Sequence, residues 1–475
     1  MTLDNALTFT PEIWLLLGAI VAFLVSRLRP RAEDVTALVG LVAVALALAA
    51  WLTQLRGRLV IFDGAYQVEG FTRLVQAVVL LSAAGSLLLT LADRTWTPAP
   101  DLAGFLLLGT LAAMLAAGAA ELSALILAIA LLGVCVSVMV VAARPASQPA
   151  PAGVSAFIAA TLATALLGYA FAFLYGLTGE TGLRAAGRAL TLHGVAQPAL
   201  GVMLALLLAG FGILLGVVPV HLGLPALFAR APLPVCAFAG SVTMTTGLAA
   251  LTRVLASTLA SSSATGVLLA LLAAVTMTAG NLAALGERSL RRLLAFLLVS
   301  QAGYGLAALS VMRHGGVAAA LVLAGGVAVA SLAAVAALIA YVHRVHSDQV
   351  ADLSGMATYA PGAALVLVLA LLSLGGLPPL AGFFGKLLVI QASIAGGLAW
   401  LALLAVLNAI LGTVVALRIT RAVFFDPPVF EVAEAPRHGA LPVALGAWGI
   451  AVVAFGAVIG PLYGFALAGA RAILP

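Results

Sequence analysis

The stretch that decides the fold is Ser373-Leu-Gly-Gly-Leu-Pro-Pro-Leu-Ala-Gly-Phe-Phe-Gly-Lys386, which lies inside an apolar segment of residues 361–395. A helix of that length would be about 52 Å long, whereas the hydrocarbon core of a bilayer is about 30 Å thick. The two adjacent prolines remove two backbone donors, and the glycines before them loosen the chain. We therefore expect a membrane helix that is broken at Gly375, Gly376, Pro378 and Pro379.

Lys386 is the single lysine of the 475-residue chain, and it follows this break. An ammonium group at membrane depth costs about 3 kcal/mol or more, so it persists mainly where it faces a protein interior or a water-filled path. The residue lies about ten positions, roughly 15 Å, before the end of its segment, which is too deep for easy snorkelling. Because a buried lysine can gain and lose a proton near neutrality, Lys386 is a candidate proton-handling residue.

The partner of Lys386 is harder to predict, because no carboxylate lies in a predicted span near it. Its ammonium group would need water, backbone carbonyls freed by the prolines, or polar side chains of another span. The side chains in question are Ser300, Gln301 and Tyr304. Without such partners, the neutral amine is the more economical state in a dry site.

The whole chain has the composition of a polytopic membrane protein, with 64% hydrophobic and 8% charged residues. Apolar runs of about 18 residues or more recur from one end to the other. We expect an all-α integral membrane protein with about fourteen transmembrane helices. The predicted spans are 12–29, 35–54, 71–92, 101–119, 122–143, 152–175, 197–217, 232–254, 263–284, 290–311, 316–342, 361–395, 398–423 and 441–465.

A second irregularity ends the span 197–217, where the sequence reads Gly216-Val-Val-Pro-Val-His-Leu-Gly-Leu-Pro225. Pro219 and Pro225 are the expected helix-breaking residues, and His221 lies between them. The histidine either titrates or hydrogen-bonds carbonyls released at Pro219 and so holds the break in shape.

The polar stretches 55–70 and 176–196 look like short surface excursions of the bundle. Gly64 and the alternating pattern of residues 58–68 predict a small β-hairpin in the first of them. The pair Gly396-Gly397 indicates the turn between the spans 361–395 and 398–423.

The arginines predict an orientation, because cytoplasmic loops carry an excess of positive charge. One set of loops carries thirteen arginines, at positions 27, 29, 31, 94, 144, 230, 288, 291, 292, 344, 418, 421 and 437. The opposite set carries eight, at positions 56, 58, 73, 184, 188, 253, 313 and 471. With an even number of spans, this bias favours both termini on the outer side of the membrane.

Several classes of function are excluded by what the sequence lacks. The net charge of +6 is scattered over loops, so it does not indicate nucleic-acid binding. Cys135 and Cys236 both lie in apolar segments and suggest neither a disulfide framework nor a metal site. Nucleotide-binding loops, cysteine clusters and Ser-His-Asp settings are absent. Redox chemistry or hydrolysis, if the protein serves them, would take place in a partner.

Several motifs together resemble the antiporter-like membrane subunits of respiratory complex I, most closely the N-type subunit (subunit 2), and also the related subunits of multisubunit cation/proton antiporters. The resemblance covers almost the whole chain. It is carried by Leu174-Tyr-Gly-Leu-Thr-Gly-Glu-Thr-Gly-Leu, by Pro219-Val-His221 with Ala231-Pro-Leu-Pro-Val235, by Leu294-Ala-Phe-Leu-Leu-Val-Ser-Gln-Ala-Gly-Tyr304, by Gly280-Asn-Leu-Ala-Ala-Leu before Arg291-Arg292, and by Ser373 to Lys386.

This resemblance implies two inverted five-helix repeats, each with one discontinuous helix, the seventh and the twelfth. The implied divisions are an N-terminal three-helix segment (1–100), a first repeat (101–260), a second repeat (261–425) and a C-terminal helix (426–475). It also implies a multi-pass protein of the bacterial cytoplasmic (inner) membrane that contacts lipid, protons and other membrane subunits. The chain itself would hold no cofactor and no metal, since flavin, iron–sulfur clusters and quinone would belong to partner subunits.

The chain departs from the family at the positions that carry its buried charges. The family has a glutamate in its fifth helix and lysines in its seventh, eighth and twelfth. Alignment of the motifs places Ala130, Leu214 and Met244 at the first three positions and Gln301 at a histidine of the tenth helix, so only Lys386 remains. Alanine, leucine and methionine cannot bind a proton, and they tend to dry the interior that they line.

Other polar residues are expected to serve the structure of the protein rather than proton transfer. Arg253, near the end of span 232–254, is expected to anchor that span at the membrane interface, and Arg291 and Arg292 are expected to set topology. Asn281 and Gln301 are expected to satisfy each other or backbone groups between helices.

Three functions follow from these observations. The first is a degenerate, structural membrane subunit of a complex-I-like oxidoreductase, with NADH or another donor and with an impaired or absent proton pathway. The second is an active proton-translocating subunit that works through Lys386. The third is a subunit of a multisubunit cation/proton antiporter or of an ion-coupled uptake complex, against which the loss of the glutamate–lysine pair argues.

Overall fold

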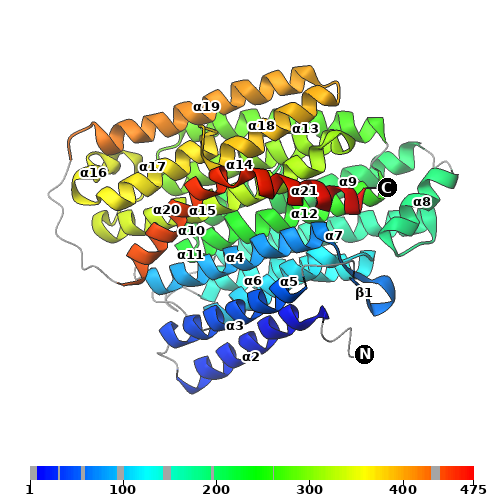
Figure 1. The fold of residues 1–475 in the computed structure, drawn as a ribbon, viewed down its shortest axis with the longest axis horizontal. Coiled ribbons are helices and arrows are strands. Elements are labelled where there is room, and N and C mark those ends of the chain that lie inside the picture. Colours follow the sequence, from blue (N-terminus) through cyan, green and yellow to red (C-terminus); the bar gives the residue numbers. More distant parts are fainter. Residues whose placement is uncertain are drawn as a thin grey trace.

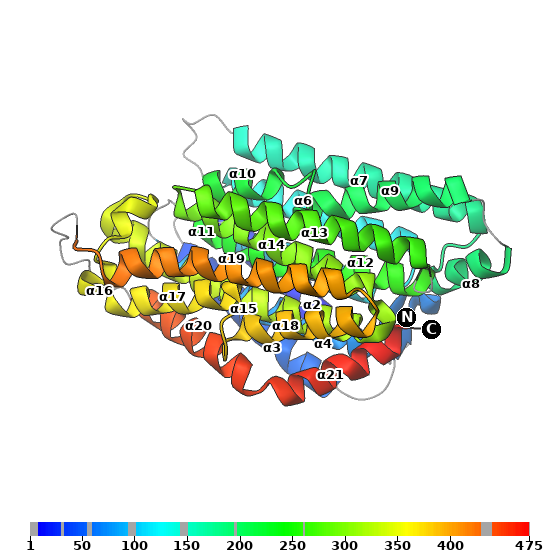
Figure 2. The same ribbon diagram turned by 90° about the horizontal axis from the view of Figure 1, so that it is seen from above.

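The computed structural model describes residues 8–29, 33–54, 59–93, 101–142, 151–193, 197–259, 262–428 and 439–474. Long helices run roughly parallel to one another through the whole molecule (Figures 1 and 2). The helices of the first half are α2 (Thr10–Leu28), α3 (Glu33–Thr53), α4 (Gly70–Ala92), α5 (Leu102–Gly118), α6 (Leu122–Ala142), α7 (Pro151–Thr178), α8 (Leu183–His193), α9 (Gln197–Leu215), α10 (Gly223–Arg230), α11 (Leu233–Phe238) and α12 (Met244–Thr258). Those of the second half are α13 (Ser263–Gly286), α14 (Leu290–Ser310), α15 (Gly316–Val345), α16 (Met356–Tyr359), α17 (Pro361–Gly375), α18 (Ala381–Ala395), α19 (Ala399–Phe424), α20 (Ala440–Ala457) and α21 (Ile459–Ile473).

These helices confirm the predicted all-α integral membrane fold. Within the described ranges, 12 helices are long and apolar enough to cross a bilayer. The two remaining predicted spans are the shorter helix α5 and the pair α17–α18. A single turn of π-helix, Ala239–Thr243, joins α11 to α12, so the eighth span is one continuous helical element from Leu233 to Thr258.

Both predicted interruptions are present. Helix α17 ends at Gly375, Gly376 has a φ of +101°, and α18 begins at Ala381 beyond a cis Pro378–Pro379 bond. Helix α9 ends at Leu215, and a non-helical segment that contains Pro219 separates it from α10. Spans seven and twelve are therefore discontinuous, as expected.

Pro225 was wrongly predicted as a breaking residue. It is the third residue of α10, where a backbone N–H would have no intrahelical acceptor, so proline is tolerated there. The last predicted span, 441–465, also needs correction, because α20 ends at Ala457 and α21 begins at Ile459. Pro461 explains the interruption: a proline ring clashes with the carbonyl four residues earlier, which here belongs to Ala457.

The core of the bundle is formed by α11–α12, α14 and α15. In an apolar stretch of 18 residues from each of these spans, 94%, 94% and 89% of the residues are buried, against 17% in α20 and 33% in α3. The outer helices expose leucine, valine and phenylalanine side chains on their outward faces. Because those faces are apolar, they are suited to hydrocarbon rather than to water.

One end of the bundle holds the start of α2, the end of α21, α8 and the β-hairpin (Figures 1 and 2). The predicted hairpin is present as strands β1 (Leu59–Ile61) and β2 (Tyr66–Val68), which pair Leu59 with Val68. The start of α2 and the end of α21 lie on the same side, which fits the predicted even number of crossings. Six of the arginines used for orientation lie outside the described residues, at positions 31, 56, 58, 94, 144 and 437.

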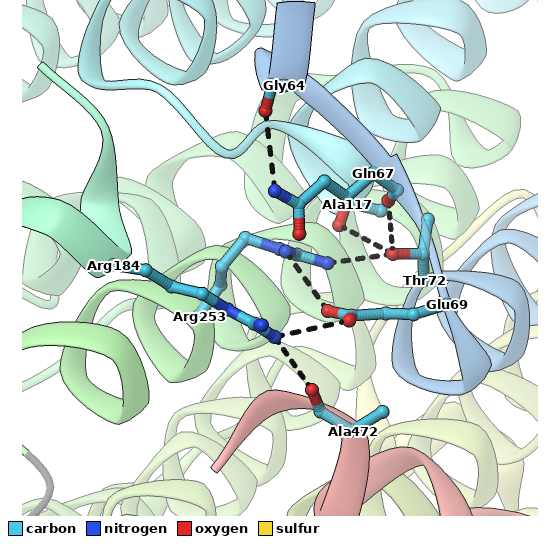
Figure 3. A network of polar contacts seen from close by, with 8 residues as sticks. All are labelled: Gly64, Gln67, Glu69, Thr72, Ala117, Arg184, Arg253 and Ala472. Atoms are coloured by element: carbon cyan, nitrogen blue, oxygen red, sulfur yellow. Dashed lines mark hydrogen bonds and ion pairs between the residues drawn. The ribbon is translucent and has the colours of Figure 1, made fainter. Parts of the chain in front are cut away.

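Arg253 was wrongly predicted as an interfacial anchor, since it lies inside the protein at this end with 3% of its surface exposed. Its Nη1 is 3.4 Å from Oε1 of Glu69, and its Nη2 donates to Thr72 Oγ1 at 2.7 Å (Figure 3). Arg184 of α8 contacts the second carboxylate oxygen of Glu69 at 3.3 Å and donates to the carbonyl of Ala472 at 2.7 Å. This network therefore ties α4, α8, α12 and α21 together.

Replacing Arg253 by methionine is expected to destabilise the protein by about 3–5 kcal/mol, because it leaves the buried Glu69 carboxylate without its buried counter-ion. Arg292→Met is the matched control: its ion pair with Glu287 has an arginine side chain that is 49% exposed, and such surface pairs contribute about 0–1 kcal/mol. Thermal unfolding of the detergent-solubilised chain measures both changes. Equal melting temperatures for the two variants would show that the buried Arg253–Glu69 pair contributes no more to stability than the exposed one.

Candidate functional site

Lys386 lies in the break of the twelfth span, on α18, with 2% of its surface exposed. Its Nζ donates to the carbonyl of Leu374 at 2.6 Å and to that of Gly375 at 2.9 Å. In a continuous helix, these two carbonyls would accept from the N–H groups of residues 378 and 379, both of which are prolines. The lysine therefore supplies the donors that the prolines remove.

The aromatic face of Tyr304 covers the ammonium group, with Nζ 4.6 Å from the ring centroid. The Tyr304 hydroxyl points elsewhere and donates to the carbonyl of Ala405 at 2.7 Å. Gln301 reaches the site through its Nε2, which donates to the same Leu374 carbonyl at 3.0 Å. Of the predicted surroundings, the freed carbonyls and Tyr304 thus touch Lys386, and Gln301 shares an acceptor with it.

Ser300 does not join this group. Its hydroxyl is buried, and among the described residues it has no hydrogen-bond partner. In the same part of the chain, no carboxylate forms an ion pair with Lys386, as the sequence indicated. The positive charge is therefore balanced by carbonyl dipoles at the end of α17 and by the ring of Tyr304.

The break of the seventh span has a different chemistry. The Nδ1 atom of His221 is 3.3 Å from the carbonyl oxygen of Pro219, and the Val218 N–H donates to Thr276 Oγ1 at 3.3 Å. The histidine lies near the surface. An imidazole with a proton on Nδ1 can donate to the Pro219 carbonyl. This contact corresponds to the prediction that His221 holds the break in shape.

The three positions of lost family charge carry apolar side chains. Leu214 lines a cavity of about 130 Å³ whose other walls are mainly alanine, leucine, isoleucine and valine. Met244 lines a cavity of about 20 Å³ together with Thr245 and Gln301. Ala130 lies half-buried on α6. None of these three side chains can hold a proton.

Asn281 and Gln301 do not satisfy each other, although that pairing was one of the two expectations. Asn281 donates to Asn408 of α19, to the side-chain oxygen at 3.0 Å and to the backbone carbonyl at 2.9 Å. Gln301 follows the other expectation, since it binds the backbone at Leu374. Arg291 is also buried inside the protein and donates to the carbonyl of Ala231 at 2.9 Å.

A second cluster, which sequence reasoning missed, lies beside the hairpin. The Tyr66 hydroxyl donates to Oε1 of Glu12 at 2.6 Å, and Gln76 Nε2 lies 3.0 Å from both of those oxygens. Burial raises the pKa of Tyr66 well above its usual value, so the phenol keeps its proton and donates it. The only signal in the sequence was a carboxylate, Glu12, at the start of an apolar span.

A metal centre is not formed by the part of the chain that the structure describes, which contains no group of three or more His, Cys, Asp or Glu residues able to hold an ion. Cys135 and Cys236 are both buried free thiols.

Comparison with known proteins agrees with this geometry. The family described as "NADH:quinone oxidoreductase/Mrp antiporter, TM" matches residues 119–412. NADH-quinone oxidoreductase subunit N 2 of Syntrophobacter fumaroxidans is 32% identical, over 99% of this chain and 100% of the relative. A chain of respiratory complex I from Thermus thermophilus with bound aureothin has a TM-score of 0.79 at 26% identity, covering 96% of this chain and 98% of that one.

A chain of the Mrp complex from Dietzia sp. has a TM-score of 0.85 at 21% identity, covering 100% of this chain and 98% of that one, which shows a shared fold. The family match covers more than half of the sequence, and the full-length relative extends it to both ends. This chain belongs to the NADH:quinone oxidoreductase/Mrp antiporter family of transmembrane proteins.

Proposed function

We propose that this chain is the N-type membrane subunit of a complex-I-like quinone oxidoreductase, and that it contributes fold and interfaces rather than a complete proton pathway. The observation that carries the proposal is the setting of Lys386, which binds two backbone carbonyls freed by prolines and no carboxylate of the described chain. The relatives named subunit N support the assignment to such a complex.

A proton pathway through the first half needs groups that bind protons and a polar interior that holds water. The family positions carry Ala130, Leu214 and Met244 instead, and the larger nearby cavity has mainly apolar walls. The polar side chains on its walls are the hydroxyls of Ser137, Ser155 and Thr243, and a cavity with few hydrogen-bond partners holds water poorly. A proton released by Lys386 therefore has no evident acceptor towards the first half.

In this proposal the redox chemistry belongs to partner subunits, which would hold the flavin, the iron–sulfur clusters and the quinone. The chain would lie in the bacterial cytoplasmic membrane with both termini on the outer side, and it would pack against other membrane subunits. The divisions 1–100, 101–260, 261–425 and 426–475 would be its N-terminal segment, two inverted repeats and C-terminal part, the last made of α20 and α21.

One observation favours the alternative of an active subunit that works through Lys386. The cavity of about 20 Å³ between Met244 and Gln301 has room for one water molecule, and Thr245 and Gln301 give it polar walls. Gln301 in turn shares the Leu374 carbonyl with Lys386. A single water in this cavity would extend the polar contacts of Lys386, by way of Gln301, to Met244 in the first half of the chain.

Replacing Lys386 by alanine in the complex rebuilt in vesicles decides between the two. We expect proton uptake per electron to stay unchanged in assembled complexes, while stability falls by about 1–3 kcal/mol, because the buried Gly375 carbonyl loses its donor and the Leu374 carbonyl keeps only Gln301. Lys386→Met is the matched variant, since it removes the charge and keeps most of the side-chain volume. A loss of proton uptake at equal electron flux and intact assembly would establish the active pathway instead.

Purification of the tagged chain from its native membrane tests the kind of complex. We expect it to bring down partners that carry flavin and iron–sulfur clusters, visible as flavin fluorescence and cluster signals in electron paramagnetic resonance. A chain that lacks the tag is the control for non-specific capture. Recovery of a stoichiometric membrane complex free of both redox groups would instead support the cation/proton antiporter.

A further inference from the structure

The Glu12 carboxyl lies in a setting that the family's proton sites do not explain. It belongs to α2, has 1% of its surface exposed, and faces β2 and α4 through Tyr66 and Gln76. Neither of these partners carries a positive charge. Among the described residues, no arginine, lysine or histidine forms an ion pair with Glu12.

The hydrogen bonds around Glu12 are unevenly divided between its two oxygens. Both donors, the Tyr66 hydroxyl at 2.6 Å and Gln76 Nε2 at 3.0 Å, converge on Oε1. Oε2 is buried and has no hydrogen-bond partner in the described structure. An ionised carboxylate spreads its charge over both oxygens and needs donors at each, whereas a carboxylic acid has one accepting carbonyl oxygen and one hydroxyl.

Glu69 provides a contrast within the same end of the molecule. It is equally buried, with 2% of its surface exposed, but two arginines face its two oxygens at 3.4 and 3.3 Å. That arrangement stabilises an ionised carboxylate, because each oxygen is paired with a cation, and Arg184 also donates a hydrogen bond to Oε2. Glu12 lacks such cations. Burying even an uncharged polar group without partners costs on the order of 2–7 kcal/mol, and burying an unpaired charge costs more. Protonation of Glu12 removes that charge.

We infer that Glu12 is a proton-binding site that holds its proton at neutral pH, while Oε1 accepts hydrogen bonds from Tyr66 and Gln76. The ligand is a proton, and the site is separate from Lys386, which lies at the break between α17 and α18. The first half of the chain thus keeps a proton-binding group although Ala130, Leu214 and Met244 hold none. The inference does not depend on the proposed function, because the protonation of Glu12 can be measured without partners.

The groups that face this cluster from neighbouring elements limit how the proton can move. Tyr66 on β2 also lies 3.3 Å from the carbonyl of Met114 on α5, and Gln76 bridges Glu12 and the phenol from α4. One turn earlier on α4, Thr72 belongs to the Arg253–Glu69 network. In that network Arg253 of α12 pairs with Glu69, and its outermost member is the half-exposed Arg184. A further charged residue of α4, Arg73, lies between Thr72 and Gln76 in the sequence and is also buried.

Infrared spectroscopy of the purified full chain in lipid, recorded in H₂O and in D₂O at neutral pH, tests the site. We expect a carbonyl stretch of a protonated carboxyl that shifts on deuteration in the wild-type chain and is lost in Glu12→Gln. Glu180→Gln, at an exposed carboxylate, is the matched control and should keep the band. Glu69→Gln should also keep the band and lose carboxylate absorption instead.

Tyr66→Phe gives a second readout that does not require the Glu12 variant to fold. Removing the phenol takes away one of the two hydrogen bonds to Oε1, so the carboxyl stretch should move to higher frequency without losing intensity. A wild-type chain with no such band, or a Glu12→Gln chain in which only carboxylate absorption is lost, would overturn the inference. An unchanged band position in Tyr66→Phe would overturn the assignment to Glu12.

Discussion

The constraint on which the second half depends is the satisfaction of backbone carbonyls where a helix breaks inside the membrane. Leu374 and Gly375 would accept hydrogen bonds from residues 378 and 379, and both are prolines. Water cannot replace those donors in a hydrocarbon environment, so each bare carbonyl would cost several kcal/mol. Lys386 donates to both, and the end of α17 also presents the negative end of its helix dipole to the ammonium. The single lysine thus compensates for the Pro-Pro pair, together with Gln301 at Leu374.

This pairing changes how the charge of Lys386 is interpreted. A neutral amine still has two N–H groups, so both forms of the side chain can satisfy the two carbonyls. The site therefore accommodates the loss of a proton without losing its structure. What the described surroundings lack is an acceptor: Tyr304 offers its ring face, and Gln301 donates to the same carbonyl as the lysine.

The sequence predicts well what depends on neighbouring residues. The two discontinuous helices, the hairpin and the number of spans follow from proline, glycine and hydrophobicity within short windows, and the structure confirms them. The prediction for Pro225 was wrong for a local reason, because the effect of a proline depends on its position within the helix. Three side chains were predicted as possible partners of Lys386: Tyr304 covers its ammonium group, Gln301 shares a carbonyl with it, and Ser300 has no hydrogen-bond partner among the described residues.

The polar networks at the hairpin end were beyond such reasoning, since their members meet only in the folded chain. Arg253 and Thr72 are 181 residues apart in sequence, and Glu12 and Gln76 are 64 apart. A charged residue near the end of a predicted span has the same sequence signature whether it reaches the head groups or turns inward. The side chain turns inward when the folded protein offers it a buried partner of opposite charge, as Glu69 does for Arg253. Glu12 is the remaining case, in which a buried carboxyl contacts only neutral donors. Binding a proton there removes the free-energy cost of an unpaired buried charge.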